Sequence, residues 1–107
     1  KVIAASVIHY INSTLAVMEK YGTQEYTFAN HAKFWSEMKG YALAFQFNPH
    51  AKISVSDFVL FHELVGDNPV LMNQDPSEID SYKQKLLTAR DILATTYEFK
   101  EENVKNW

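Results

Sequence analysis

The chain has 107 residues, no cysteine and a formal net charge of −3, and 47% of its residues are hydrophobic. This length suits one compact domain with a core, and the composition is not that of a disordered segment. The lack of cysteine excludes disulfides, thiolate metal sites and thiol catalysis, while the scattered basic residues argue against nucleic acid as a partner. No apolar run approaches the roughly 20 residues of a membrane-spanning helix.

The first predicted element is a helix from Val2 to Tyr21. Two adjacent apolar stripes run along it at helical spacing, which predicts burial over a wide arc. They consist of Ile3, Val7, Tyr10, Thr14, Val17 and Tyr21, and of Ala4, Ile8, Ile11, Leu15 and Met18. Gly22 follows the last periodic residue, where a left-handed cap favours glycine. The glycosylation sequon that begins at Asn12 lies inside this helix, so we expect it to be accidental.

The second predicted element, Phe28 to Phe47, is the central packing helix. Thr27 is its expected N-cap, although Thr23 could cap an earlier turn, and Asn48-Pro49 is its expected end. One apolar stripe follows it at spacings of three and four, formed by Phe28, His31, Trp35, Met38, Ala42 and Phe45. Gly40 costs up to ~1 kcal/mol inside a helix, which predicts a close neighbouring helix there. On that basis Gly40→Leu is expected to destabilise the fold by about 1–3 kcal/mol through overpacking.

A short helix is predicted over Val55 to Val65, because Ser54 and Asp57 have the spacing of a capping box and Gly66 follows the apolar pattern. Its inner face is expected to carry Phe58, Phe61, His62 and Val65. A turn-rich loop follows, in which Val70, Leu71 and Met72 are expected to close one end of a bundle.

The last long helix is expected to begin at Asp75-Pro76 and to run to about Tyr97, since Asp75 is a favourable N-cap and proline suits the first helical position. Its seam has a mean period of 3.5 and contains Ile79, Tyr82, Leu86, Ala89 and Leu93. One further turn is expected at Glu101 to Val104. The sequence therefore predicts an all-α, antiparallel bundle of about four helices in a single domain, residues 1–107.

His62-Glu63-Leu-Val-Gly66 resembles the start of the helical zinc motif H-E-x-x-H. The second histidine of that motif would fall at position 66, which is Gly66. Because a catalytic zinc needs three protein ligands, the broken pair predicts a helix end with His62 packed or partly exposed. We therefore expect no catalytic residues and no metal ligands in this chain.

His31 has two possible roles. Burial and the positive end of its helix both favour the neutral imidazole, which can be either a metal ligand or a core residue with one hydrogen bond. No second ligand follows three or four residues later, so the core role is favoured. In that role its pKa falls below the usual value, whereas a ligand role predicts loss of a bound metal on His31→Gln.

Glu37 lies about 240° around the helix from His31, so these two residues cannot close a site within one helix. Glu37 instead neighbours Lys33 and Tyr41, and a surface ion pair with Lys33 is predicted. The sequence leaves open whether His9 on the first helix approaches His31.

Three stretches carry a family resemblance: His31-Ala-Lys-Phe-Trp-Ser-Glu-Met-Lys-Gly-Tyr-Ala-Leu-Ala-Phe-Gln-Phe-Asn-Pro49, Phe61-His-Glu-Leu-Val-Gly-Asp67 and Asn103-Val-Lys-Asn-Trp107. Together they resemble the C-terminal part of imelysin-like bacterial cell-envelope proteins, often called iron-regulated protein A. The resemblance covers nearly the whole chain. It implies an all-helical fold of two bundle halves, export to the periplasm or cell envelope, frequent lipid anchoring, and a suspected link to iron or haem acquisition.

The same resemblance implies that this chain is the C-terminal half of a longer protein whose N-terminal half is its partner. The chain begins with Lys1, so we expect either a processed form or a fragment. The peptidase label of the family rests on a G-x-H-x-x-E motif that this sequence lacks. The resemblance leaves two hypotheses. One is a non-enzymatic binding or scaffold domain in which His31, Trp35, Glu37 and Tyr41 face a groove or the partner half. The alternative is a metal-dependent peptidase.

Overall fold

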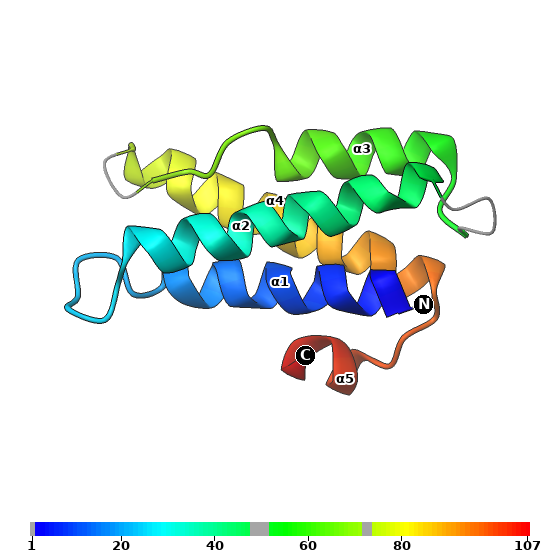
Figure 1. The fold of residues 1–107 in the computed structure, drawn as a ribbon, viewed down its shortest axis with the longest axis horizontal. Helices are drawn as coiled ribbons and strands as arrows, with labels where there is room; N and C mark the ends of the chain where they lie inside the picture. The colour runs from blue at the N-terminus through cyan, green and yellow to red at the C-terminus, as the bar shows by residue number, and fades with distance from the viewer. Residues whose placement is uncertain (1, 48–51, 72–73) are drawn as a thin grey trace.

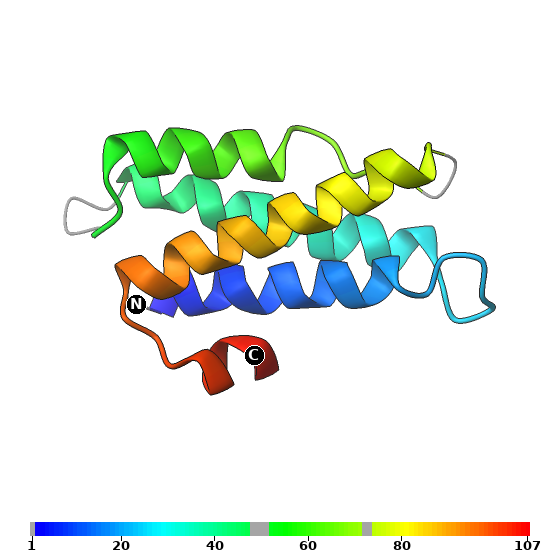
Figure 2. The ribbon, with the colours of Figure 1, turned by 180° about the vertical axis from the view of Figure 1, so that it is seen from behind.

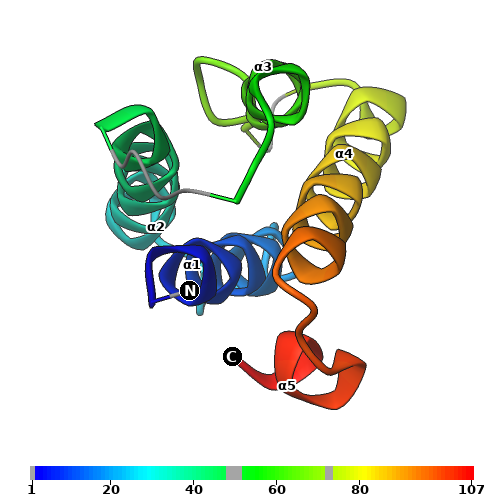
Figure 3. The same cartoon turned by 90° about the vertical axis from the view of Figure 1, so that its right-hand side faces the viewer.

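The computed structural model describes residues 2–47, 52–71 and 74–107, and this part of the chain is helical without strands. The α-helices in order are α1 (Val2–Met18), α2 (Phe28–Leu43), α3 (Val55–Val65), α4 (Pro76–Thr96) and α5 (Glu101–Asn106). Helices α1 to α4 run alternately in opposite directions, and the end view shows them side by side in chain order with α5 outside (Figures 1 and 3). The predicted all-α, antiparallel bundle is confirmed.

The core lies between the four long helices, and its largest contact joins α1 to α2. Helix α1 also contacts α4 and α5, which explains why it is buried over a wide arc, as predicted. Its buried residues are Ala4, Val7, Ile8, Ile11, Thr14, Val17 and Met18. The helix ends at Met18 rather than at Tyr21, since Lys20 and Tyr21 donate to carbonyls only three residues back and tighten the last turn. Gly22 has a φ of 78°, as the cap prediction requires.

The N-cap and the buried stripe of helix α2 agree with the sequence prediction, with one exception. The Asn30 N–H donates to the Thr27 hydroxyl at 3.2 Å, which confirms the N-cap. The predicted stripe from His31 to Phe45 is buried, and a 3-10 turn, Ala44–Phe47, continues the helix. Phe28 does not belong to this stripe, because it is 58% exposed. It is the first residue of α2, whose first turn extends past the end of α1 (Figure 1).

The predicted starts of α3 and α4 are also confirmed. The Asp57 N–H donates to the Ser54 hydroxyl at 3.1 Å, and the Ser77 N–H donates to the Asp75 carboxylate at 3.1 Å. Gly66 ends α3 with a φ of 77°. Helix α4 then crosses the back of the bundle diagonally (Figure 2).

The inner faces of α3 and α4 are largely as predicted. The buried predicted residues are Phe61 and Val65 on α3 and Tyr82, Leu86, Ala89 and Leu93 on α4. The predicted end at Asn48-Pro49 and the predicted packing of Met72 fall outside the described residues. Among the described helices, none combines the length and apolar character needed to cross a bilayer.

The predicted close helix crossing at Gly40 is wrong. Gly40 is exposed, and a Cβ added there would meet no atom within 4 Å. The glycine therefore gives no close approach to a neighbour, and the expected overpacking by Gly40→Leu has no physical basis. What remains is the lower helix propensity of glycine, and nothing in the structure offsets that loss.

Gly40→Ala is expected to raise the free energy of unfolding by roughly 0.5–1 kcal/mol, because alanine restricts the unfolded chain and fits the open space. Denaturant unfolding would measure this. Gly22→Ala is the matched control and should lower stability by at least about 1 kcal/mol, since its φ of 78° disfavours a Cβ. Destabilisation by Gly40→Ala would contradict the open environment.

Candidate functional site

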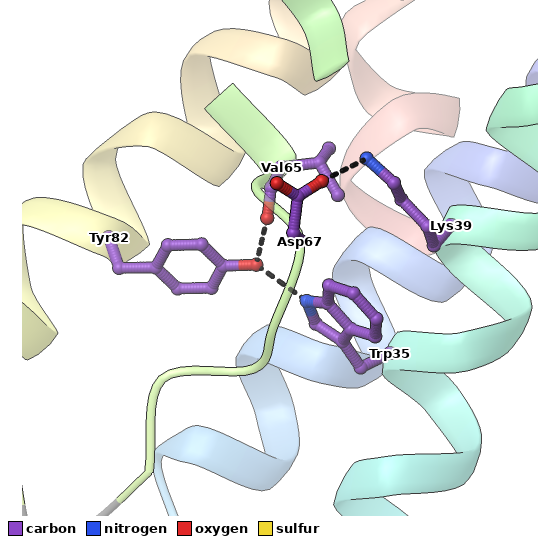
Figure 4. A network of polar contacts seen from close by, with 5 residues as sticks. All are labelled: Trp35, Lys39, Val65, Asp67 and Tyr82. Atoms are coloured by element: carbon purple, nitrogen blue, oxygen red, sulfur yellow. Dashed lines mark hydrogen bonds and ion pairs between the residues drawn. The ribbon is translucent and has the colours of Figure 1, made fainter. Parts of the chain in front are cut away.

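A chain of buried hydrogen bonds joins three helices at the centre of the bundle. The Trp35 indole N–H of α2 donates to the Tyr82 hydroxyl of α4 at 2.8 Å, and that hydroxyl donates to the Val65 carbonyl of α3 at 2.7 Å (Figure 4). The Val65 carbonyl lies in the last turn of α3, where carbonyls lack partners within the helix. Tyr82 therefore completes the end of α3 while it fixes the position of Trp35.

This central chain is suited to structure rather than proton transfer. Burial raises the pKa of Tyr82 to about 12, against the opposing effect of the Trp35 hydrogen bond. The hydroxyl is therefore a neutral donor at physiological pH. Beside it, Lys39 and Asp67 form an ion pair at 3.8 Å (Figure 4). Because the Asp67 side chain is 94% exposed, solvent screens this pair and it adds little stability.

His31 is fully buried near the start of α2. Its Nδ1 shares a hydrogen bond of 2.9 Å with the Tyr26 hydroxyl, and the Tyr21 ring lies 5.8 Å away between ring centres. Its Nε2 is buried and has no hydrogen-bond partner among the described residues. Burial lowers the pKa of His31, so the neutral ring is favoured. His9 is exposed on α1 and packs edge-on against Tyr10, so it does not share this environment.

Glu37 and Tyr41 lie on another side of α2, beside α1. The Tyr41 ring stacks on Tyr10 at 5.6 Å and 10°. The Glu37 carboxylate near the Tyr10 hydroxyl is the main cause that raises the pKa of Tyr10, and burial raises it further. The predicted Lys33–Glu37 ion pair is not formed, although both residues are described. The four predicted binding residues therefore form no single site.

Tyr41 instead belongs to an apolar groove on the outer face of α1. The groove has a volume of about 410 Å³, and we call it the α1 groove. Its lining residues are Val2, Ala5, Ser6, His9, Tyr10, Tyr41 and Trp107. We call the small α1 residues of this lining its floor, and the aromatic rings of α1, α2 and the C-terminal residue its walls. The Trp107 ring packs edge-on against Phe99 at 4.8 Å between ring centres, so a residue outside the groove lining also holds it in place.

Asn12 is a polar link that holds α5 against the bundle. Its amide N–H groups donate to the Val104 carbonyl at 2.8 Å and the Trp107 carbonyl at 2.9 Å. The Arg90 guanidinium of α4 donates to the side-chain amide oxygen of Asn12 at 2.8 Å. The sequon asparagine is thus engaged on both ends of its amide, and it positions Trp107 at the edge of the α1 groove.

His62, the histidine of the incomplete zinc motif, lies half-buried at the inner side of α3, and Glu63 is exposed. Its ring packs edge-on against Phe58 at 4.5 Å and Phe61 at 5.8 Å. Gly66 ends the helix where the motif needs a second ligand. In the described part of the chain, no three His, Cys, Asp or Glu side chains gather as a metal site.

These features define the class of the molecule as a four-helix antiparallel bundle with interior polar links and an apolar surface groove. Comparisons of the chain with family models, with curated proteins and with solved structures found no match.

Tyr82→Phe is expected to lower the free energy of unfolding by about 1–3 kcal/mol, because it leaves the Trp35 N–H and the Val65 carbonyl unpaired in the core. Denaturant unfolding would measure the change. Tyr41→Phe is the matched control, and removing this exposed hydroxyl should alter stability by less than about 0.5 kcal/mol. Equal stability of Tyr82→Phe and the wild type would show that the hydrogen-bond chain is dispensable.

His31 is expected to make the fold sensitive to acid. Its pKa in the folded chain is lowered by burial, so its contribution to stability is fully present above its unfolded value of about 6.5. That contribution is lost as pH falls below 6.5 towards the folded value, by up to about 1.4 kcal/mol per pH unit. His31→Gln should reduce the slope of stability against pH in this range.

The measurement is the free energy of unfolding between pH 5 and 8. His9→Gln, which removes an exposed histidine, should retain the wild-type slope. An unchanged slope in His31→Gln would contradict the buried neutral state, and metal present in the wild type but absent from His31→Gln would establish a ligand role instead.

Proposed function

We propose that this chain is a non-enzymatic binding or scaffold domain of an exported bacterial envelope protein of the imelysin-like type. The observation that carries the proposal is the α1 groove, because it is an apolar concave surface with supported aromatic walls outside the bundle core. The envelope location, lipid anchoring and link to iron or haem acquisition rest on the resemblance of the three sequence stretches alone.

The proposed occupant of the α1 groove is a helix from the N-terminal half of the same protein. Ala5 and Ser6 form a low floor, which lets a helix approach closely. Tyr41 and Trp107 stand at the walls and supply large rigid contact areas. An apolar helix face in such a groove is a recurrent mode of helix recognition. Val2, which is 81% exposed at one end of the groove, would gain burial in such a complex.

His31 and Trp35 act in this proposal from the interior, where they fix the packing of α2. Glu37 acts on the wall of the groove through its effect on Tyr10. Of the four predicted binding residues, Tyr41 alone lines the α1 groove. The proposed function therefore needs a surface formed by three parts of the chain rather than a site on one helix.

The test is association of this chain with the preceding part of its open reading frame, produced as a separate polypeptide. Ala5→Arg should weaken the association at least about tenfold, because it places an unpaired charge on the apolar floor. Ala16→Arg is the matched control, since Ala16 is an exposed alanine of the same helix outside the groove. Titration calorimetry would measure both, with unfolding curves to show that the variants fold.

Equal affinity of Ala5→Arg and the wild type would overturn the role of the α1 groove. Failure of the wild type to associate, or a reading frame without a further helical segment, would overturn the proposed partner. Peptide cleavage that a chelator abolishes would replace the proposal with the peptidase alternative.

A further inference from the structure

The contact between α3 and α2 contains a titratable group without a partner. Both ring nitrogens of His62 are buried, and neither has a hydrogen-bond partner among the described residues. The rings of Phe58 and Phe61, on the same helix, pack edge-on against the His62 ring. A neutral imidazole has one N–H to satisfy, whereas the protonated ring has two and a positive charge. In the closed contact the Ala42 carbonyl of α2 favours the protonated ring, but it can accept only one of the two N–H groups, and the charge stays buried.

The charged groups around His62 come from α2 and from the end of α3. Burial lowers the pKa of His62, and the Lys39 ammonium of α2 lowers it further. The Ala42 carbonyl of α2 and the Asp67 carboxylate act in the opposite direction and do not reverse the shift. From α4, the titratable group at this end of α3 is Tyr82, which stays neutral because its pKa is raised to about 12.

The packing of α3 is uneven. The helix packs more closely on α4 than on α2, and non-helical segments flank it on both sides. Its outer face leaves Val55 and Val59 exposed, so the side that holds α3 to the bundle carries Phe61 and Val65. Lys39 of α2 forms an ion pair with Asp67, which follows α3. Solvent screens most of its attraction, because the Asp67 side chain is exposed. The α2–α3 contact is therefore weaker than the contact between α3 and α4.

We propose that protonation of His62 opens the contact between α2 and α3, so that α3 is an acid-released cover over the bundle core. In the opened state water can solvate the imidazolium, whereas in the closed state the ring is buried away from water. Opening also separates the new positive charge from Lys39. Between the lower pKa of the closed state and the ordinary pKa of the opened state, opening is coupled to the uptake of up to one proton.

The linkage sets the pH range of the opening. In the opened state His62 regains its ordinary pKa of about 6.5, while the value in the closed state is lower. The opening equilibrium is therefore constant above pH 6.5. Below that value the opening constant rises by up to about tenfold per pH unit, until the closed state also becomes protonated.

The test is amide hydrogen exchange of the wild-type chain between pH 5 and 7.5, corrected for the intrinsic pH dependence of exchange. Amides of α3 should lose more protection below pH 6.5 than amides of α1, whose protection falls only with the stability of the whole domain. In His62→Leu the α3 protection should depend on pH no more than that of α1, because the buried site is apolar and no longer titrates. His9→Leu, at an exposed histidine, is the matched control and should behave as the wild type.

Two results would overturn the proposal: equal loss of protection in α3 and α1, or the wild-type pH dependence persisting in His62→Leu. If His62→Leu does not fold, an NMR titration of the wild-type imidazole decides the matter. A His62 resonance that titrates below 6.5 together with the α3 amides supports the opening, and one that titrates while the α3 amides stay protected refutes it.

Discussion

The hydrogen-bond chain from Trp35 through Tyr82 to Val65 is the constraint on which the packing of the bundle depends. An indole N–H and a phenol hydroxyl are costly to bury without partners, and here each satisfies the other. One hydroxyl thereby sets the rotation of α2 and α4 about their axes and fixes the end of α3. Because α3 ends there, Asp67 comes within reach of Lys39, and His62 one turn earlier is held against α2.

Local signals predicted the elements well because they depend on neighbouring residues. The caps at Thr27, Ser54 and Asp75 each join groups two or three residues apart, and the apolar periodicity identified most of the core. Gly40 and Phe28 were misjudged for a different reason. Whether a glycine faces a neighbour, or whether the first residue of a helix is covered, depends on where other helices end.

The polar links were missed for the same reason. Trp35 and Tyr82 are 47 positions apart, and Asn12 binds carbonyls 92 and 95 positions away. Each of these residues was visible in the sequence, but only as a core or sequon position. A tyrosine and a tryptophan on facing apolar seams are a usable signal, because both need a hydrogen-bond partner when buried. The α1 groove had no such signal, since its walls come from α1, α2 and the C-terminal residue, which are far apart in the sequence.

The two buried histidines show why burial alone does not define a pH response. Both have a lowered pKa, so acid weakens the folded state at either position. His31 keeps one hydrogen bond to Tyr26, and its helix forms the largest contact of the bundle with α1. Protonation of His31 therefore lowers the stability of the whole domain rather than of one helix. His62 has no such bond and lies where α3 is held less closely, so the same proton can act on one helix before the core is lost.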